Sequence, residues 1–132
     1  MKQQKQIQRI YIQTLIQACK EGMNHSHKMG KRIALNEDAK RAFYQLGATF
    51  KLFMSDIGQS FGLNDMDKWL PEISKGTIQR LFFTKDAYHF NISNLDYVLK
   101  RIQEISDDNI FKSHQISVEA SECFTAVSYT HL

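Results

Sequence analysis

The sequence predicts an all-α fold, a compact helical domain of about five helices. Apolar residues recur every three or four positions in several segments, which is the spacing of an amphipathic helix. Residues whose side chains cap helices precede most of these segments, and the chain has a single proline, Pro71. With 132 residues and 42% apolar side chains, the chain can form one hydrophobic core but not separate cofactor and substrate domains. We therefore expect one helical domain over residues 1–126.

The first two helices are predicted over 3–22 and over about 37–58. Asn36 offers a side-chain oxygen to cap the second helix, and two acidic residues follow in its first turn, where negative charge suits the helix dipole. A polar, basic loop is expected between the two helices, over 24–32. The expected apolar stripes are Ile7, Ile10, Tyr11, Leu15, Ala18 and Cys19 in the first helix, and Ala42, Phe43, Leu46, Phe50, Phe53, Met54 and Ile57 in the second.

Three shorter helices are predicted after these. Asn64 is expected to cap one that Pro71 stops, because proline disfavours helical geometry at the preceding residue. Ser74 and Ser93 are expected to cap the other two, with Tyr88–Phe90 as a short extended piece between them. The expected inward residues are Met66, Trp69 and Leu70, then Ile78, Leu81 and Phe82, then Leu95, Val98, Leu99, Ile102 and Ile105.

The C-terminal end of the chain has a weaker pattern. Helix and strand both remain open over 110–126. The last six residues, Val-Ser-Tyr-Thr-His-Leu at 127–132, look like a translated transposase end sequence of the kind ligated to DNA during library preparation. We expect that they do not belong to the natural chain, which would then be known only to Ala126. The alternative is a genuine tail.

Charge is distributed unevenly along the chain, although the net charge is only +3. Residues 1–35 hold seven basic and one acidic residue, and 36–72 hold four basic and six acidic. Residues 73–105 hold five basic and three acidic, and 106–132 hold one basic and four acidic. The two basic regions permit contact with a polyanion, and a solvated lysine face is the alternative.

Features missing from the sequence argue against several classes of protein. No apolar run approaches the roughly 18 residues of a membrane span, and the polar, basic start is unlike a signal peptide, so we expect a cytoplasmic protein. Cys19 and Cys123 lie far apart and are expected to be free thiols. His25 and His27 have no Glu or Cys companion, so no metal is expected. No nucleophile motif or phosphate-binding glycine loop is present, and we expect neither a cofactor nor an enzyme.

The segment 63–83 has the arrangement of a DNA-binding helix-turn-helix. The second helix of that unit needs apolar anchors and polar or basic residues near its N-terminus, and Ile78 and Leu81 would be the anchors. Glutamine can pair bidentately with adenine, and Lys and Arg bind phosphate or guanine. The alternative is two amphipathic helices that complete the core. The expected DNA-contacting residues are Lys75, Thr77, Gln79 and Arg80, with Lys31 and Arg32 on phosphate.

Part of this segment also resembles a known family. The sequence S-K-G-T-I-Q-R-L over 74–81 is followed, after ten residues, by I-S-N-L-D-Y-V-L-K-R-I over 92–102. This stretch is similar to the second half of phage-repressor-type helix-turn-helix domains, in which a capped helix follows the reading helix. Those domains usually have a small residue facing the turn and a glycine within it. This sequence has Lys68 and Glu72 at the corresponding places.

A longer similarity combines the long first helix with three other segments. These are A-F-Y-Q-L-G over 42–47, the Leu- and Met-containing stretch over 63–70, and the Phe82-Phe83 pair. Together they resemble the FlhD family, the smaller subunits of the flagellar master activator. The resemblance implies a helical homodimer that binds DNA with a larger, zinc-containing FlhC partner. It also implies a helix junction at Leu46-Gly47 and partner or DNA contact by 63–83. Gln45 departs from the arginine usual in the family, and the basic loop is an addition.

Two classes of function therefore remain open. The first is a DNA-binding transcriptional regulator, expected to be a dimer, whose 74–83 helix reads the major groove. The second is a helical interaction subunit that binds a protein partner through its apolar stripes and reaches DNA only through that partner, or not at all. An ion pair of Arg80 with Asp65 or Asp67 would favour the second class, because the charge needed for phosphate would already be neutralised.

Overall fold

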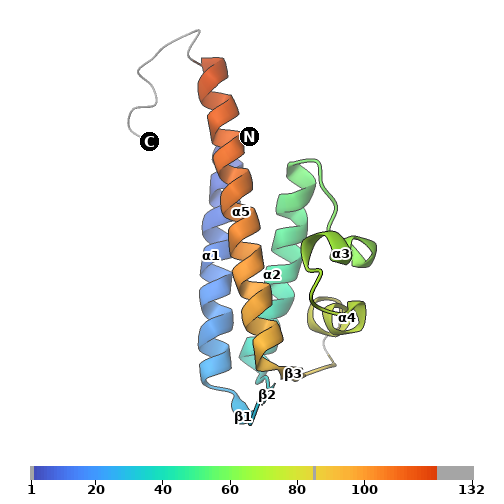
Figure 1. Cartoon of the computed structure of the whole chain (residues 1–132). Helices are drawn as coiled ribbons and strands as arrows, with labels where there is room; N and C mark the ends of the chain where they lie inside the picture. Colours follow the sequence, from blue (N-terminus) through green and yellow to red (C-terminus); the bar gives the residue numbers. More distant parts are fainter. Residues whose placement is uncertain (1, 85, 122–132) are drawn as a thin grey trace.

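The computed structural model describes the backbone of residues 2–84 and 86–121, and the side chains of 9–84 and 86–108. Cys123 and the tail at 127–132 lie outside the described residues. Three long helices lie side by side, and two short helices pack against them (Figure 1). The long helices are α1 (Lys2–Asn24), α2 (Glu37–Asp56) and α5 (Ile92–Ser121). The short ones are α3 (Met66–Trp69), after a 3-10 turn over Leu63–Asp65, and α4 (Lys75–Phe82). The predicted helical fold with five helices is confirmed.

The predicted loop over 24–32 is wrong, because most of it forms a β-hairpin. Strands β1 (His27–Met29) and β2 (Arg32–Ala34) pair antiparallel, and β3 (His89–Asn91) adds to the free side of β2. Gly30 has a φ of 63°, a conformation that allows a two-residue turn between the first two strands. The small sheet caps the end of the molecule where α1 ends and α2 and α5 begin (Figure 1). The extended piece predicted around Tyr88–Phe90 is confirmed by β3.

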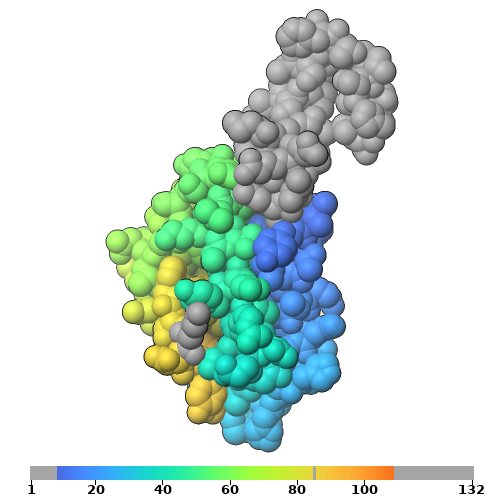
Figure 2. All heavy atoms as spheres, turned by 180° about the vertical axis from the view of Figure 1, so that it is seen from behind, coloured from blue at the N-terminus to red at the C-terminus, as the bar shows by residue number. Residues whose placement is uncertain are grey.

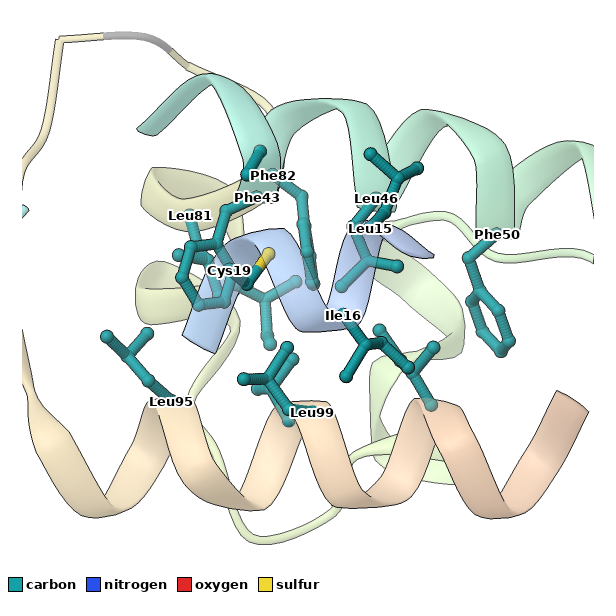
Figure 3. Packing of buried hydrophobic residues seen from close by; sticks show 14 of the residues in the cluster. Leu15, Ile16, Cys19, Phe43, Leu46, Phe50, Leu81, Phe82, Leu95 and Leu99 are labelled. Atoms are coloured by element: carbon teal, nitrogen blue, oxygen red, sulfur yellow. The ribbon is translucent and has the colours of Figure 1, made fainter. Parts of the chain in front are cut away.

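Buried residues of the three long helices and of α4 pack together in the core (Figure 3). Ile33 and Phe90 of the sheet belong to the same core. A chain of aromatic rings crosses it: the Phe50 and Phe61 ring centroids are 4.8 Å apart, and those of Phe61 and Phe82 are 5.9 Å apart. The predicted inward residues of α2 are buried from Ala42 to Met54, and those of α4 and of the first half of α5 are buried as well. The described residues include no helix long and apolar enough to cross a membrane.

The inward face of α1 differs from the predicted stripe. Its buried residues are Ile12, Leu15, Ile16, Cys19 and Met23. Ile10, Tyr11 and Ala18, which were expected to face inward, are exposed. The reason is that α1 packs against α2 and α5 together, so its buried side is centred between those two contacts and is rotated from the stripe that spacing alone suggests.

Two of the four predicted helix caps are confirmed. The Asn36 side chain accepts a hydrogen bond from the Ala39 N–H at 2.8 Å, and the Ser74 hydroxyl accepts one from the Thr77 N–H at 3.2 Å. The Asn64 and Ser93 predictions are wrong. Asp65 accepts from the Gly62 N–H at 2.8 Å before the short helix. At the start of α5, the side chain of Asn91, two residues before Ser93, accepts from the Ser93 N–H at 3.0 Å.

Two further predictions concern the long helices, and the structure decides both. The segment 110–121, for which helix and strand were both open, continues α5. Helix α2 runs through Leu46 and Gly47 without a break, so the junction that the FlhD resemblance implies at those residues is absent.

Candidate nucleic-acid interface

Helix α4 is held in one orientation by its buried side. Ile78, Leu81 and Phe82 point into the core, and the Phe82 ring lies against Gly47 of α2. The Ser74 cap fixes the start of the helix. Because three buried residues and a cap set its rotation, the remaining side chains of α4 have a defined direction outward.

The exposed face of α4 carries three of the four residues predicted to contact DNA. Lys75, Gln79 and Arg80 are exposed, and Lys75 and Gln79, four residues apart, are neighbours on one side of the helix. Gly76 lies among them, and a Cβ added there would have no atom within 4 Å. Thr77 is different. It is half-buried, and its hydroxyl is 3.0 Å from that of Ser74, so it belongs to the cap of the helix.

Arg80 connects α4 to the sheet. Its Nη2 donates to the His89 carbonyl oxygen at 2.7 Å, and its guanidinium carbon is 4.8 Å from the centre of the Phe90 ring. Among the described residues its partners include neither Asp65 nor Asp67. The positive charge of Arg80 is therefore not neutralised by either carboxylate that would have favoured the second function class.

The other predicted residues, Lys31 and Arg32, lie on the β1–β2 hairpin and are exposed. Lys28, on β1, is exposed as well, and its Nζ donates to the Met23 carbonyl oxygen at 3.0 Å. The hairpin forms the lower tip of the molecule in Figure 2, below α2. It belongs to the same sheet as β3, the strand that Arg80 holds. The structure thus links the hairpin and α4 through one shared element.

Ion pairs in the described part of the chain avoid both of these basic elements. They include Arg9–Asp107, Lys40–Glu37, Arg41–Asp38 and Arg101–Glu104. None includes a cation of the hairpin or of α4. The cations on these two connected elements therefore form no ion pair with a described residue, and lysine and arginine are the side chains that bind a phosphate backbone.

The helices over 63–83 match the predicted helix-turn-helix only in part. Its second helix is present as α4. Its first is α3, a helix of four residues that follows a 3-10 turn. Trp69 and the backbone around it tie α3 down: the indole N–H donates to the Ser60 carbonyl oxygen at 2.8 Å, and Arg101 of α5 donates to the Trp69 carbonyl oxygen at 3.3 Å. A DNA-reading role for this unit stays a prediction.

Sequence reasoning missed the hairpin and, with it, Lys28 and Met29. Each strand has three residues, which is too short to show the alternation that identifies a strand. A glycine followed by a charged residue at the centre, with Ile33 close behind, is the one local signal that could have indicated the turn.

The described residues offer little to other chemistries. Cys19 is buried, and burial raises the pKa of its thiol well above the ordinary range, which keeps it protonated and unreactive. Among the described residues, no three His, Cys, Asp or Glu side chains gather as a metal site would require. The His25 Nδ1, just after the end of α1, lies 2.9 Å from the Glu21 carbonyl oxygen in the last turn of that helix.

Comparison with known protein families, curated proteins and solved structures finds no match to this chain. The phage-repressor and FlhD resemblances therefore stay predictions made from the sequence.

Proposed function

We propose that this chain is a transcriptional regulator that binds double-stranded DNA directly, with the exposed face of α4 in the major groove. The observation that carries the proposal is the exposed, unpaired polar face of α4, with Lys75 and Gln79 side by side on it. Gln79 would meet base edges, and Lys75 would meet phosphate or guanine. Lys31 and Arg32 of the hairpin would add phosphate contacts.

Arg80 has a different part in this proposal from the one its sequence position suggested. Its guanidinium already contacts the His89 carbonyl oxygen and the Phe90 ring. We assign it to positioning α4 against the sheet. Thr77, as part of the cap, would support the helix rather than read a base.

The proposal is tested by changing the charge at the start of α4 without losing its cap. Asp, Asn and Ser are all good capping residues, so Ser74→Asp and Ser74→Asn should unfold at about the same urea concentration as the parent chain. If α4 approaches phosphate, Ser74→Asp should weaken binding through repulsion, whereas Ser74→Asn should bind like the parent. Fluorescence anisotropy of the full chain with a labelled duplex gives both affinities.

A salt series completes this test. Each phosphate contact contributes about 0.9 to the slope of log affinity against log salt, so Lys75→Ala should lower that slope by about one. Equal affinities for the two Ser74 variants, together with an unchanged slope for Lys75→Ala, would contradict a role for α4. Absence of binding by the parent chain would contradict the proposal as a whole.

We include a homodimer in the proposal, because major-groove readers of this kind bind paired half-sites about one helical turn apart. Ile10 on α1 and Leu52 on α2 are 58% and 63% exposed and offer apolar surface for a second copy. Sedimentation equilibrium should give twice the chain mass. The substitution Leu52→Glu should return the monomer if α2 is in the contact.

The same exposed apolar residues favour the alternative function, an interaction subunit that reaches DNA through a partner such as an FlhC-like protein. In that case the isolated chain would show no salt-dependent DNA binding, while Leu52→Glu would abolish capture of the partner.

A further inference from the structure

We propose that the β1–β2 hairpin is a second DNA-reading element, which enters the minor groove beside the major groove occupied by α4. This inference rests on the proposed function and extends it from one contact surface to two.

The shape of the hairpin suits a groove. Its turn consists of Gly30 and Lys31, with Gly30 at a positive φ of 63°, and the strands close immediately on the pair Met29–Arg32. A two-residue turn of this kind gives a narrow tip with the strands held together up to its end.

The chemistry of the tip suits the minor groove in particular. Lys28, Met29, Lys31 and Arg32 are all exposed, and none of the three cations forms an ion pair within the described part of the chain. Arginine and lysine are favoured in a narrow minor groove, where the negative potential is enhanced. Methionine is among the apolar residues that minor-groove proteins insert between base steps.

The hairpin is fixed relative to α4, so the two can engage DNA together. Arg32 is paired with Asn91 across the sheet, and the buried residues Ile33 and Phe90 face each other in the same register. The Ile92 N–H donates to the Lys31 carbonyl oxygen at 2.8 Å, which ties the turn to the start of α5. Arg80 of α4 donates a hydrogen bond to His89, the residue before Phe90, and so joins α4 to β3. Because major and minor grooves alternate along a duplex, an element held beside the major-groove helix meets the minor groove next.

The experiment compares two duplexes that differ only in the minor groove. Replacing adenine by 2,6-diaminopurine leaves the major-groove pattern of the A·T pair unchanged and adds to the minor groove an amino group like that of guanine. Anisotropy of the full parent chain is measured on both duplexes. The tip variant is Lys31→Ala/Arg32→Ala. A matched control, Lys51→Ala/Lys100→Ala, removes the same charge from two exposed lysines of α2 and α5.

We expect the parent chain and the control to bind the diaminopurine duplex roughly tenfold more weakly, which is the usual effect of one unfavourable base pair. The tip variant should bind both duplexes equally, and its salt slope should fall by about two. Far-UV circular dichroism of the tip variant must match the parent for the comparison to stand.

The outcomes separate this inference from the proposed function. If the parent binds both duplexes equally, or if the tip variant keeps the parent's discrimination, the hairpin does not read the minor groove, although α4 can still bind DNA. If the Ser74 and Lys75 variants also leave binding unchanged, or if the parent does not bind, both the inference and the proposed function are overturned.

Discussion

The ring of Phe82 in α4 lies directly against Gly47 in α2. A Cβ at position 47 would come 2.5 Å from the Phe82 Cδ1 and 3.0 Å from its Cβ. Such contacts are too short for a real side chain, so the missing side chain at Gly47 sets how closely α4 approaches the long helices. The position of Lys75 and Gln79 therefore depends on a glycine in another helix.

Gly47→Ala should destabilise the fold. The overpacked methyl group must displace the Phe82 ring or α4, at a cost of about 1–3 kcal/mol, and this exceeds the helix-propensity gain of up to about 1 kcal/mol. Urea unfolding followed by circular dichroism measures the change. Gly76→Ala is the control, because a Cβ there meets open space; it should stabilise by about 0.5–1 kcal/mol. Equal effects of the two substitutions would contradict the contact.

Ser26 is a second position where one small side chain joins two elements. Its hydroxyl donates to the Gly22 carbonyl oxygen at 2.7 Å and accepts from the Asn36 N–H at 2.9 Å, and the residue is buried. Ser26→Ala would leave the Asn36 N–H without this acceptor, and we expect a loss of about 1–3 kcal/mol in the free energy of unfolding. Ser55→Ala, on the exposed side of α2, should stay within about 0.5 kcal/mol of the parent. A neutral Ser26→Ala would show that water replaces the lost partner.

Ser26 also illustrates what the sequence could not predict. It lies in a polar, basic stretch that was predicted to be a loop, and no local pattern indicates that its partner is the residue before the next helix. The hairpin has the same difficulty. Three-residue strands show no clear alternation, and the pairing of Ile33 with Phe90 joins segments far apart in the chain. The long helices were predictable because their apolar spacing repeats over many turns.

The candidate interface was predictable to a similar extent. The anchors Ile78 and Leu81 fixed which side of α4 is buried, so the exposure of Lys75 and Gln79 followed from spacing. The hydrogen bond from Arg80 to His89 could not be predicted from spacing, because His89 comes next to α4 only when β3 joins the sheet. The rotation of α1 was also missed, because spacing gives the period of a stripe but not which of several apolar residues meet the neighbouring helices.

Cys19 provides a prediction for pH dependence. Burial raises the pKa of its thiol in the folded state above the ordinary 9.0, so the thiol contributes no pH dependence well below pH 9. Above that pH the unfolded chain loses the proton while the folded chain keeps it, and stability falls by up to about 1.4 kcal/mol per pH unit. The free energy of unfolding of the parent, compared with that of Cys19→Ala between pH 8 and 10.5, should show this extra loss. Parallel curves would contradict a buried, protonated thiol.

The ion pair between Arg9 and Asp107 gives the last prediction, which concerns the contact between α1 and α5. The Arg9 Nε lies 2.9 Å from one Asp107 oxygen, and the Gln103 side chain donates to both oxygens of the same carboxylate. The side chains are 33% and 43% exposed, so solvent screens the pair and a coupling of only about 0.5–1 kcal/mol is expected. A double-mutant cycle with Arg9→Met and Asp107→Asn isolates this coupling from the loss of each side chain. It should decrease when the salt concentration is raised from about 0.05 M to 1 M, because the Debye length shortens from more than 10 Å to about 3 Å. A coupling that is absent at low salt would mean that Gln103 alone holds the carboxylate and that Arg9 contributes only the packing of its side chain.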